Sequence, residues 1–163
     1  MVRKCVESRS SSPDSGAIRA AAVALLARRD YLTAGLQQRL QSQGFDPAAA
    51  AAVIAELTAE RLLEDERFVE RFVVSRAERG HGPLRIAMDL RSQGAPEALI
   101  EAAIRAGPDW GAVAREVRRR KFGPEPPGSW PEKDRQARFL QYRGFSSDHI
   151  RAATGADFED SRT

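Results

Sequence analysis

The chain has 163 residues, of which 42% are hydrophobic and 30% charged, with a formal net charge of +3. This is enough for one compact domain or a short row of coupled modules. The single cysteine, Cys5, cannot form an intrachain disulfide, and no apolar run approaches the ~18–20 residues that span a bilayer, so we expect a cytoplasmic protein rather than an exported or membrane-embedded one.

The chain begins with residues 1–16, which we expect to form a disordered basic tail. This segment carries charge and serine where a secretory signal needs an apolar stretch. A first helix is predicted to follow, because Ile18, Ala22 and Leu25 recur at the i, i+4, i+7 spacing of one helix face.

A six-residue segment then recurs with a period of fifty: LQSQGF from Leu40, LRSQGA from Leu90 and LQYRGF from Leu140. Each glycine is predicted to take the left-handed conformation just past a helix end, so that the residue after it packs on the leucine in a Schellman cap. Ala95 would make this contact weakly. The marks of the repeat are Leu40, Gly44, Phe45, Leu90, Gly94, Leu140, Gly144 and Phe145.

A second helix should start after each glycine. Asp46-Pro47 reads as N-cap and first helical residue, Pro96 fits a first turn, and Ser146 is a candidate N-cap. Core positions are expected six and nine residues beyond each glycine, at Ala50, Ile100, Ile150, Val53, Ala103 and Ala153.

An upstream helix completes each unit, with apolar pairs at helical spacing around Phe68 and Phe72 and around Trp110 and Val117. The predicted helices cover residues 17–28, 33–43, 47–62, 65–79, 83–93, 96–106, 109–121, 131–143 and 146–154. Gly80-His-Gly-Pro83 and Gly123-Pro-Glu-Pro-Pro-Gly128 are loops that no helix crosses.

No stretch alternates apolar and polar residues as a β-strand does. We therefore predict an all-α fold of three tandem three-helix repeats, stacked into an elongated, curved right- or left-handed array. The repeats are placed at residues 17–62, 63–107 and 108–155, and a C-terminal tail at 156–163.

Charge is unevenly distributed along the chain. Residues 1–29 carry a net +4, residues 56–70 a net −4 and residues 111–151 a net +5. Such banding favours contact with nucleic acid or nucleoprotein. The same arginines also fit solvated helix faces, and charge alone does not choose between these readings.

These features together resemble the RecX family, bacterial regulators of RecA recombinase. The resemblance covers roughly residues 17–155. It is carried by Arg28-Arg29-Asp30-Tyr31, Leu40, Gly44-Phe45, Leu63-Glu-Asp-Glu-Arg67-Phe68, Arg79-Gly-His-Gly-Pro83-Leu-Arg85-Ile86, Leu90, Gly94, Trp110, Lys121-Phe122-Gly123, Phe139-Leu140 and Arg143-Gly144-Phe145.

The resemblance implies three three-helix repeats, no cofactor, and binding in the groove of the RecA–DNA filament, where strand exchange and co-protease activity are restrained. It implies a place in DNA repair, recombination and the SOS response. One departure lies at the second helix, where the family's Ser and Glu of a capping box are Leu32 and Gly35. Thr33 is the replacement N-cap that we expect.

Catalysis finds little support. The two histidines, His81 and His149, fall in different repeats and Cys5 in the tail, so His/Cys metal sets and Cys-His pairs are not expected. Glu64-Asp65-Glu66 diverge around a helix start and suit the helix dipole. Gly80-His-Gly82 lacks the strand or the Lys-Ser/Thr of a phosphate-binding loop. We expect no enzyme activity, metal or cofactor.

The better functional candidates are basic residues near helix ends, because guanidinium groups bind carboxylates and phosphates through forked hydrogen bonds. The candidate filament or DNA contacts are Arg79, His81, Arg85, Arg118, Arg119, Arg120, Lys121, Arg135 and Arg143. Phe45, Phe68, Phe72, Phe139 and Phe145 are predicted to be core, and the role of Trp130 stays open.

Two hypotheses follow from these observations. The first is a monomeric protein that regulates RecA by occupying the filament groove. The second is a helical-repeat protein that binds single- or double-stranded DNA directly through its basic C-terminal third.

Overall fold

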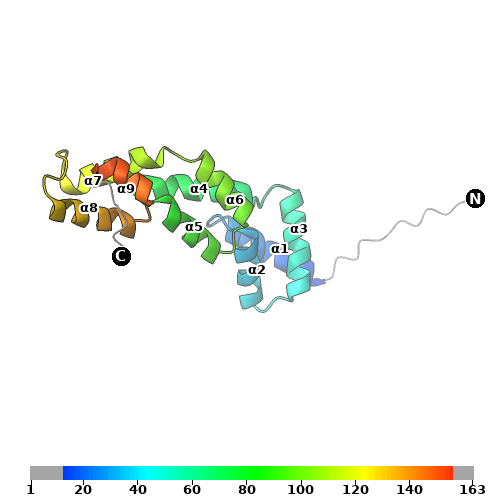
Figure 1. Ribbon diagram of the computed structural model, residues 1–163. Helices are drawn as coiled ribbons and strands as arrows, with labels where there is room; N and C mark the ends of the chain where they lie inside the picture. The colour runs from blue at the N-terminus through cyan, green and yellow to red at the C-terminus, as the bar shows by residue number, and fades with distance from the viewer. Residues whose placement is uncertain (1–12, 156–163) are drawn as a thin grey trace, which may run out of the picture. The chain divides into compact units, whose positions relative to one another are not determined.

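The structure, a computed structural model, describes residues 13–155, and this part of the chain contains nine helices and no β-strand (Figure 1). The predicted all-α class is confirmed. In chain order the helices are α1 (Pro13–Leu26), α2 (Thr33–Ser42), α3 (Pro47–Ala59), α4 (Asp65–Glu78), α5 (Pro83–Ser92), α6 (Glu97–Ala106), α7 (Trp110–Phe122), α8 (Trp130–Tyr142) and α9 (Ser147–Thr154).

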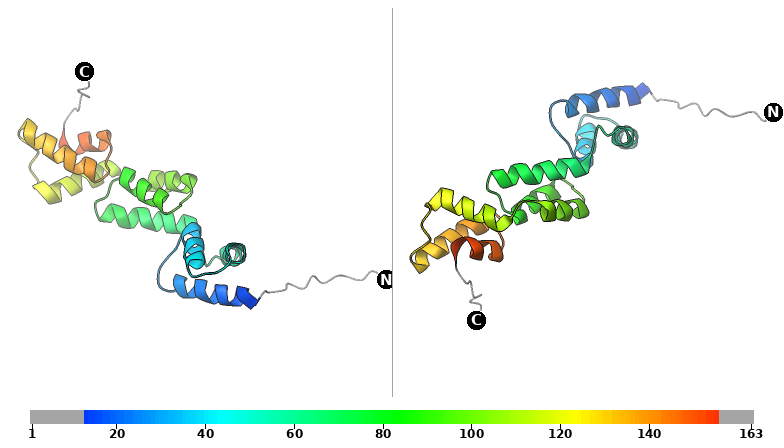
Figure 2. Two further views of the ribbon diagram at one scale, coloured as in Figure 1. Left: turned by 90° about the horizontal axis from the view of Figure 1, so that it is seen from below. Right: turned by 90° about the horizontal axis from the view of Figure 1, so that it is seen from above.

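The helices form three triplets, as the fifty-residue period predicts. The chain divides into two compact units, the first ending at Glu64 and the second beginning at Asp65. The first unit holds α1–α3. The second holds two triplets, α4–α6 and α7–α9, which the two views of Figure 2 show as a green cluster and a yellow-to-red cluster.

All three repeated glycines end a helix in the left-handed region. Gly44, Gly94 and Gly144 have φ of 92°, 83° and 92°. The next residue in each repeat donates its backbone N–H to the leucine five residues back, at 3.3, 3.1 and 3.1 Å in chain order. Together with the bond from each glycine N–H, as from Gly44 to the Gln41 carbonyl, this is the full Schellman pattern, and the prediction is confirmed.

Five of the six predicted core positions are buried, and the sixth, Ala153, is half-buried. Ala50, Val53, Ile100, Ala103 and Ile150 are all buried. In the first unit they join Ile18, Leu36, Leu40 and Leu57 in one cluster, and in the third repeat Ala114, Leu140 and Phe145 do the same. The first and third triplets therefore each have an apolar core of their own, and in the second Val69, Val73, Ile86, Leu90 and Ile100 are buried.

Of the five phenylalanines predicted to be core, Phe145 is fully buried, and Phe45, Phe68, Phe72 and Phe139 are half-buried. On α4 it is Val69 and Val73 that are fully buried, whereas Phe68 and Phe72 are half-buried and stack on each other with ring centroids 6.1 Å apart. The two pairs sit one position apart with the same i, i+4 spacing, so periodicity alone does not decide which pair faces inward.

Two helix starts also differ from expectation. Helix α1 begins at Pro13, so residues 13–16 are helical and not part of a tail; the remainder of the predicted tails, 1–12 and 156–163, lies outside the described residues. Helix α2 is preceded by Leu32, which makes no side-chain cap, and Thr33 is already inside the helix. The expected replacement cap at Thr33 was therefore wrong.

Candidate functional site

The nine candidate residues come from three places in the second unit: the α4–α5 turn, the last turn of α7, and α8 with the residue that follows it. In the structure, some of these side chains already bond to other groups of the protein, and the others remain available at its surface.

Arg118 belongs to the first group and is at odds with the prediction of a surface contact. Only 7% of it is exposed. Its guanidinium donates to the carbonyls of Glu125 at 2.9 Å, Pro124 at 3.2 Å and Gly123 at 3.3 Å, and to Gln136 Oε1 at 3.3 Å. Arg118 therefore fixes the loop after α7 to α8, and its donors are not free for a partner.

Arg119 and Arg120 are exposed but share one carboxylate. Both donate to Glu116 at 2.8 Å, one turn earlier on α7. These hydrogen bonds lower the pKa of Glu116 to about 2. One of the four positive charges of the Arg118–Lys121 run is thus offset by Glu116. The unit has two other pairs at i, i+3 or i, i+4 spacing, Arg138–Asp134 and Arg151–Asp148.

The available residues gather where the second and third repeats meet. The backbone of the α4–α5 turn runs against the Schellman turn that ends α8: Gly82 N–H donates to the Arg143 carbonyl at 2.7 Å, and Leu84 N–H to the Gly144 carbonyl at 3.0 Å. A Cβ on Gly82 would lie 2.3 Å from the Gly144 carbonyl group, so this approach requires glycine. The two turns, sixty residues apart, carry basic residues that become neighbours.

A chain of contacts links these residues. Arg143 Nη1 donates to the Arg79 carbonyl at 3.2 Å, and its guanidinium lies 5.3 Å from the Phe139 ring. That ring meets Phe122 edge to face at 5.3 Å, and Phe122 in turn lies under the guanidinium of Arg135 at 5.3 Å. Aromatic rings thus hold guanidinium groups in place without neutralising them.

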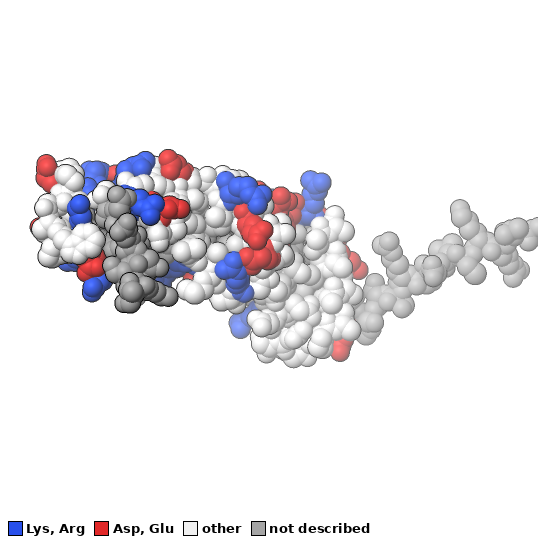
Figure 3. Space-filling view, viewed as in Figure 1, with Lys and Arg blue, Asp and Glu red and all other residues white. Residues whose placement is uncertain are grey.

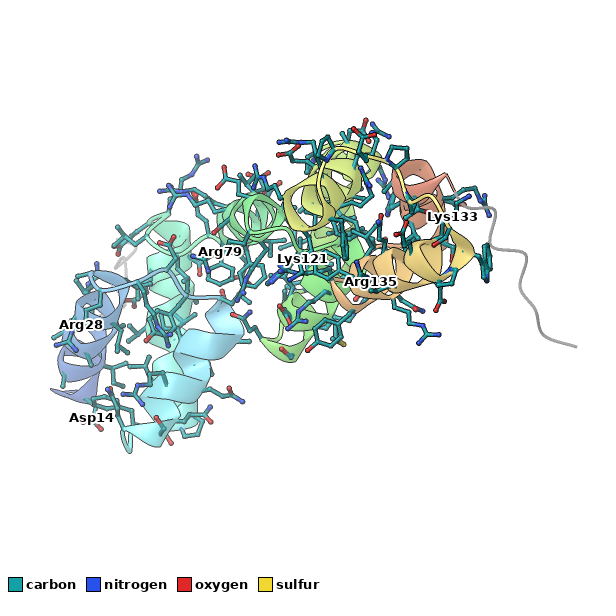
Figure 4. All side chains as sticks on the ribbon, turned by 90° about the vertical axis from the view of Figure 1, so that its left-hand side faces the viewer. Asp14, Arg28, Arg79, Lys121, Lys133 and Arg135 are labelled. Atoms are coloured by element: carbon teal, nitrogen blue, oxygen red, sulfur yellow. The ribbon has the colours of Figure 1, made fainter. Side chains whose placement is uncertain are left out.

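We call Arg79, Arg85, Lys121, Arg135 and Arg143 the basic band. Figure 4 shows Arg79, Lys121 and Arg135 following one another across the second unit. No member of the band forms a salt bridge with a carboxylate among residues 13–155. On the face drawn in Figure 3, by contrast, basic and acidic side chains lie interspersed over α4–α9.

His81 sits beside the band and differs from its members. Its Nδ1 is buried and has no hydrogen-bond partner in the described part of the chain. Burial lowers the pKa of His81 below its usual 6.5, and the positive charges of Arg85, Arg76 and Arg143 lower it further, against a smaller opposite effect of Asp89. The neutral imidazole is therefore favoured, and His81 adds no charge to the band near pH 7.

The other histidine has a structural role. His149 Nδ1 accepts from the Ser146 backbone N–H at 3.3 Å, while the Ser146 hydroxyl accepts from the His149 N–H at 3.4 Å. This reciprocal cap confirms Ser146 as the N-cap of α9.

Sequence reasoning missed a second surface next to the band. Leu84 and Met88 on α5 and Tyr142 at the end of α8 are 59%, 61% and 78% exposed. A signal was present, because Leu84 and Met88 lie at i, i+4 on a helix whose core face is Ile86 and Leu90. Trp130, whose burial was left open, is 61% exposed.

Within residues 13–155 no three His, Cys, Asp or Glu side chains converge as a metal site would require. The helices of this part of the chain are also too short or too polar to cross a bilayer. Guanidinium groups without carboxylate partners, as in the basic band, can bind an acidic surface.

Comparison with known protein families agrees with the helix triplets. Models of the first, second and third three-helix domains of RecX match residues 19–57, 65–104 and 112–154. The chain belongs to the RecX family. The resemblance inferred from the sequence motifs is thereby confirmed.

Relatives within the family match over most of their length. A regulatory protein RecX of Halorhodospira halophila is 47% identical over 147 residues, covering 90% of this chain and 91% of the relative. One from Pseudomonas fluorescens Pf-5 is 39% identical over 146 residues, covering 88% and 94%. The crystal structure of RecX from Lactobacillus salivarius superposes with a TM-score of 0.76 at 18% identity, covering 86% of this chain and 94% of that one, and shares the fold.

Proposed function

We propose that this protein regulates RecA recombinase by binding in the groove of the RecA–DNA filament, where it blocks strand exchange and co-protease activity. Membership of the RecX family, whose curated members carry the name regulatory protein, supports a regulatory role. The observation that carries the proposal is the basic band, five cationic side chains without carboxylate partners among the described residues, drawn from two repeats of one compact unit.

The band suits a nucleoprotein filament because guanidinium groups bind both protein carboxylates and DNA phosphates. Backbone hydrogen bonds join the α4–α5 turn and the start of α5 to the end of α8, and these elements carry every member of the band except Lys121. A rigid helical body in the groove would exclude a second duplex or a repressor without any covalent step. We accordingly expect no enzyme activity.

The test is RecA-dependent strand exchange, run beside RecA-dependent repressor cleavage. We expect this protein to inhibit both when it is present at about one molecule per few RecA protomers. Full activity of RecA in both assays at stoichiometric protein would reject the proposal.

Direct DNA binding is the second candidate, favoured by the three members of the band that lie in the third repeat, Lys121, Arg135 and Arg143. It predicts filament-free binding whose log K falls with log salt by about 0.9 per neutralised duplex phosphate. In this second proposal the cations without a carboxylate partner make the phosphate contacts. Replacing Lys121 and Arg135 by alanine should reduce the salt slope, whereas replacing the paired Arg119 and Arg120 should change it little.

A further inference from the structure

A groove of about 480 Å³ lies beside the basic band, between α5 and the turn that joins α8 to α9. It falls within the second unit, so both walls belong to one compact body. Its lining residues are Leu84, Arg85, Met88, Gln141, Tyr142, Gly144, Phe145, Ser146, Ser147 and Ile150.

Five of the lining residues have large apolar side chains, beside the polar Arg85, Gln141, Ser146 and Ser147. Phe145 and Ile150 at its floor are 1% and 5% exposed, and Leu84, Met88 and Tyr142 around it are the large exposed apolar side chains described above. The third repeat and the second each contribute part of this surface. Contiguous apolar side chains left open in a concave surface mark a binding site more often than scattered ones do.

The walls are held in place before any ligand arrives. The hydrogen bonds from Gly82 to the Arg143 carbonyl and from Leu84 to the Gly144 carbonyl join the start of α5 to the α8–α9 turn. Because a preformed site loses little conformational entropy on binding, a single side chain inserted here adds usefully to affinity.

The charge that lines the groove is positive. Arg85 is its only charged lining residue; its guanidinium lies 5.8 Å from the Tyr142 ring, and it makes no salt bridge with a described carboxylate. Arg143 of the basic band precedes the Gly144 that lines the groove. An occupant that places an apolar side chain in the groove and a carboxylate beside it would match both features.

We propose that the groove takes a large apolar side chain from an acidic protein segment and that this segment belongs to a RecA subunit of the filament. This rests on the proposed function and adds an anchoring contact to it. Of the two aromatic lining residues, Phe145 is only 1% exposed and the Tyr142 ring lies 5.8 Å from the Arg85 guanidinium. The aliphatic Leu84 and Met88 are exposed, which suits Leu, Ile, Met or Phe better than a nucleobase, because a base stacks on flat rings.

The test compares Met88→Glu with a matched control, Val74→Glu. Val74, on α4 of the same unit, is 53% exposed and does not line the groove. Binding to RecA filaments on single-stranded DNA is measured by co-sedimentation at low and high salt. We expect Met88→Glu to weaken binding by at least about tenfold at both salt concentrations, since burial of one such side chain is worth roughly that factor or more, and Val74→Glu to bind like the unchanged protein.

The outcomes separate the two proposals. Absence of filament binding by the unchanged protein would overturn the proposed function and this inference together. Filament binding that is equal for Met88→Glu and Val74→Glu would overturn the inference alone.

Three further measurements would show, if positive, that the groove binds something other than a RecA segment. Loss of filament-free DNA binding in Met88→Glu would assign it to a base. A dimer of the unchanged protein that Met88→Glu dissociates would assign it to a second copy. Tighter filament binding by a chain ending at Gly155 would assign it to residues 156–163. Each of these results would overturn the proposed RecA segment.

Discussion

Gly82→Ala should destabilise the second unit severely although its backbone is one that alanine adopts freely. Gly82 has φ −84° and ψ 166°, so the substitution carries no conformational strain of its own. Its Cβ, however, would stand 2.3 Å from the Gly144 carbonyl carbon and oxygen and 2.5 Å from the Phe145 nitrogen. These are backbone atoms of a buried turn, which cannot move aside as a flexible side chain does.

The size of this destabilisation follows from the contacts that the added Cβ would break. Overpacking in a closed interior costs about 1–3 kcal/mol. Moving α5 away from the α8–α9 turn also breaks the hydrogen bonds of 2.7 and 3.0 Å between them, at about 1 kcal/mol each. We expect the free energy of unfolding to fall by about 3–5 kcal/mol.

Gly123→Ala is the matched control. Gly123 lies in the same unit and has φ +93°, so alanine there is strained, but nothing lies within 4 Å of the added Cβ. Its ψ of 173° places it in a region that essentially only glycine occupies, so the expected loss is about 1–3 kcal/mol. Both tryptophans of the chain, Trp110 and Trp130, belong to the second unit, so urea denaturation followed by tryptophan fluorescence reports on both variants. A loss for Gly82→Ala no larger than for Gly123→Ala would refute the close approach.

Three other changes test the site. Arg118→Met should lower the free energy of unfolding by about 3 kcal/mol in urea denaturation, because it removes four hydrogen bonds of a buried guanidinium and leaves the buried Gln136 Oε1 without this donor; a loss below about 1 kcal/mol would contradict the buried role. The folded pKa of His81 is lowered, so the free energy of unfolding should fall as pH drops below about 6.5. His81→Gln should flatten this dependence in denaturation curves at pH 7.5, 6.5 and 5.5. Identical pH dependence of the two proteins would refute the lowered pKa. Because the pKa of Glu116 is lowered, its ion pairs stabilise the fold above pH 4.5, and this contribution is lost as pH falls toward about 2. The melting temperatures of wild type and Glu116→Gln should therefore converge as the pH falls from 4.5 to about 2. A constant difference would count against the pairing of Glu116 with Arg119 and Arg120.

The features that sequence reasoning anticipated correctly are those set by local chemistry. A Schellman cap involves six consecutive residues, so Leu40, Gly44 and Phe45 and their counterparts carry the whole signal. The core positions after each glycine follow for the same reason, because helix period and cap register fix them together. The reciprocal cap of Ser146 was half visible, since its partner His149 is not the usual Glu or Gln.

The features that were missed depend on distant partners. Arg118 is buried by Gln136 and a loop, and the need for glycine at Gly82 arises from Gly144, sixty-two residues away. The pairing of Arg119 and Arg120 with Glu116 was local and foreseeable from their i, i+3 and i, i+4 spacing. The members of the basic band could not be identified without the fold, because they come from separate parts of the second and third repeats.

The central claim, that carboxylate-free cations rather than net charge engage the filament, is tested most directly by two double variants of equal charge. One replaces Arg79 and Arg135 of the basic band by alanine. The other replaces Arg91 and Arg138, which are salt-bridged to Glu97 and Asp134. In a titration of RecA filaments on single-stranded DNA, we expect the first variant to bind at least about tenfold more weakly than the unchanged protein and the second to stay within about twofold. Equal weakening of both variants, or of neither, would contradict the account.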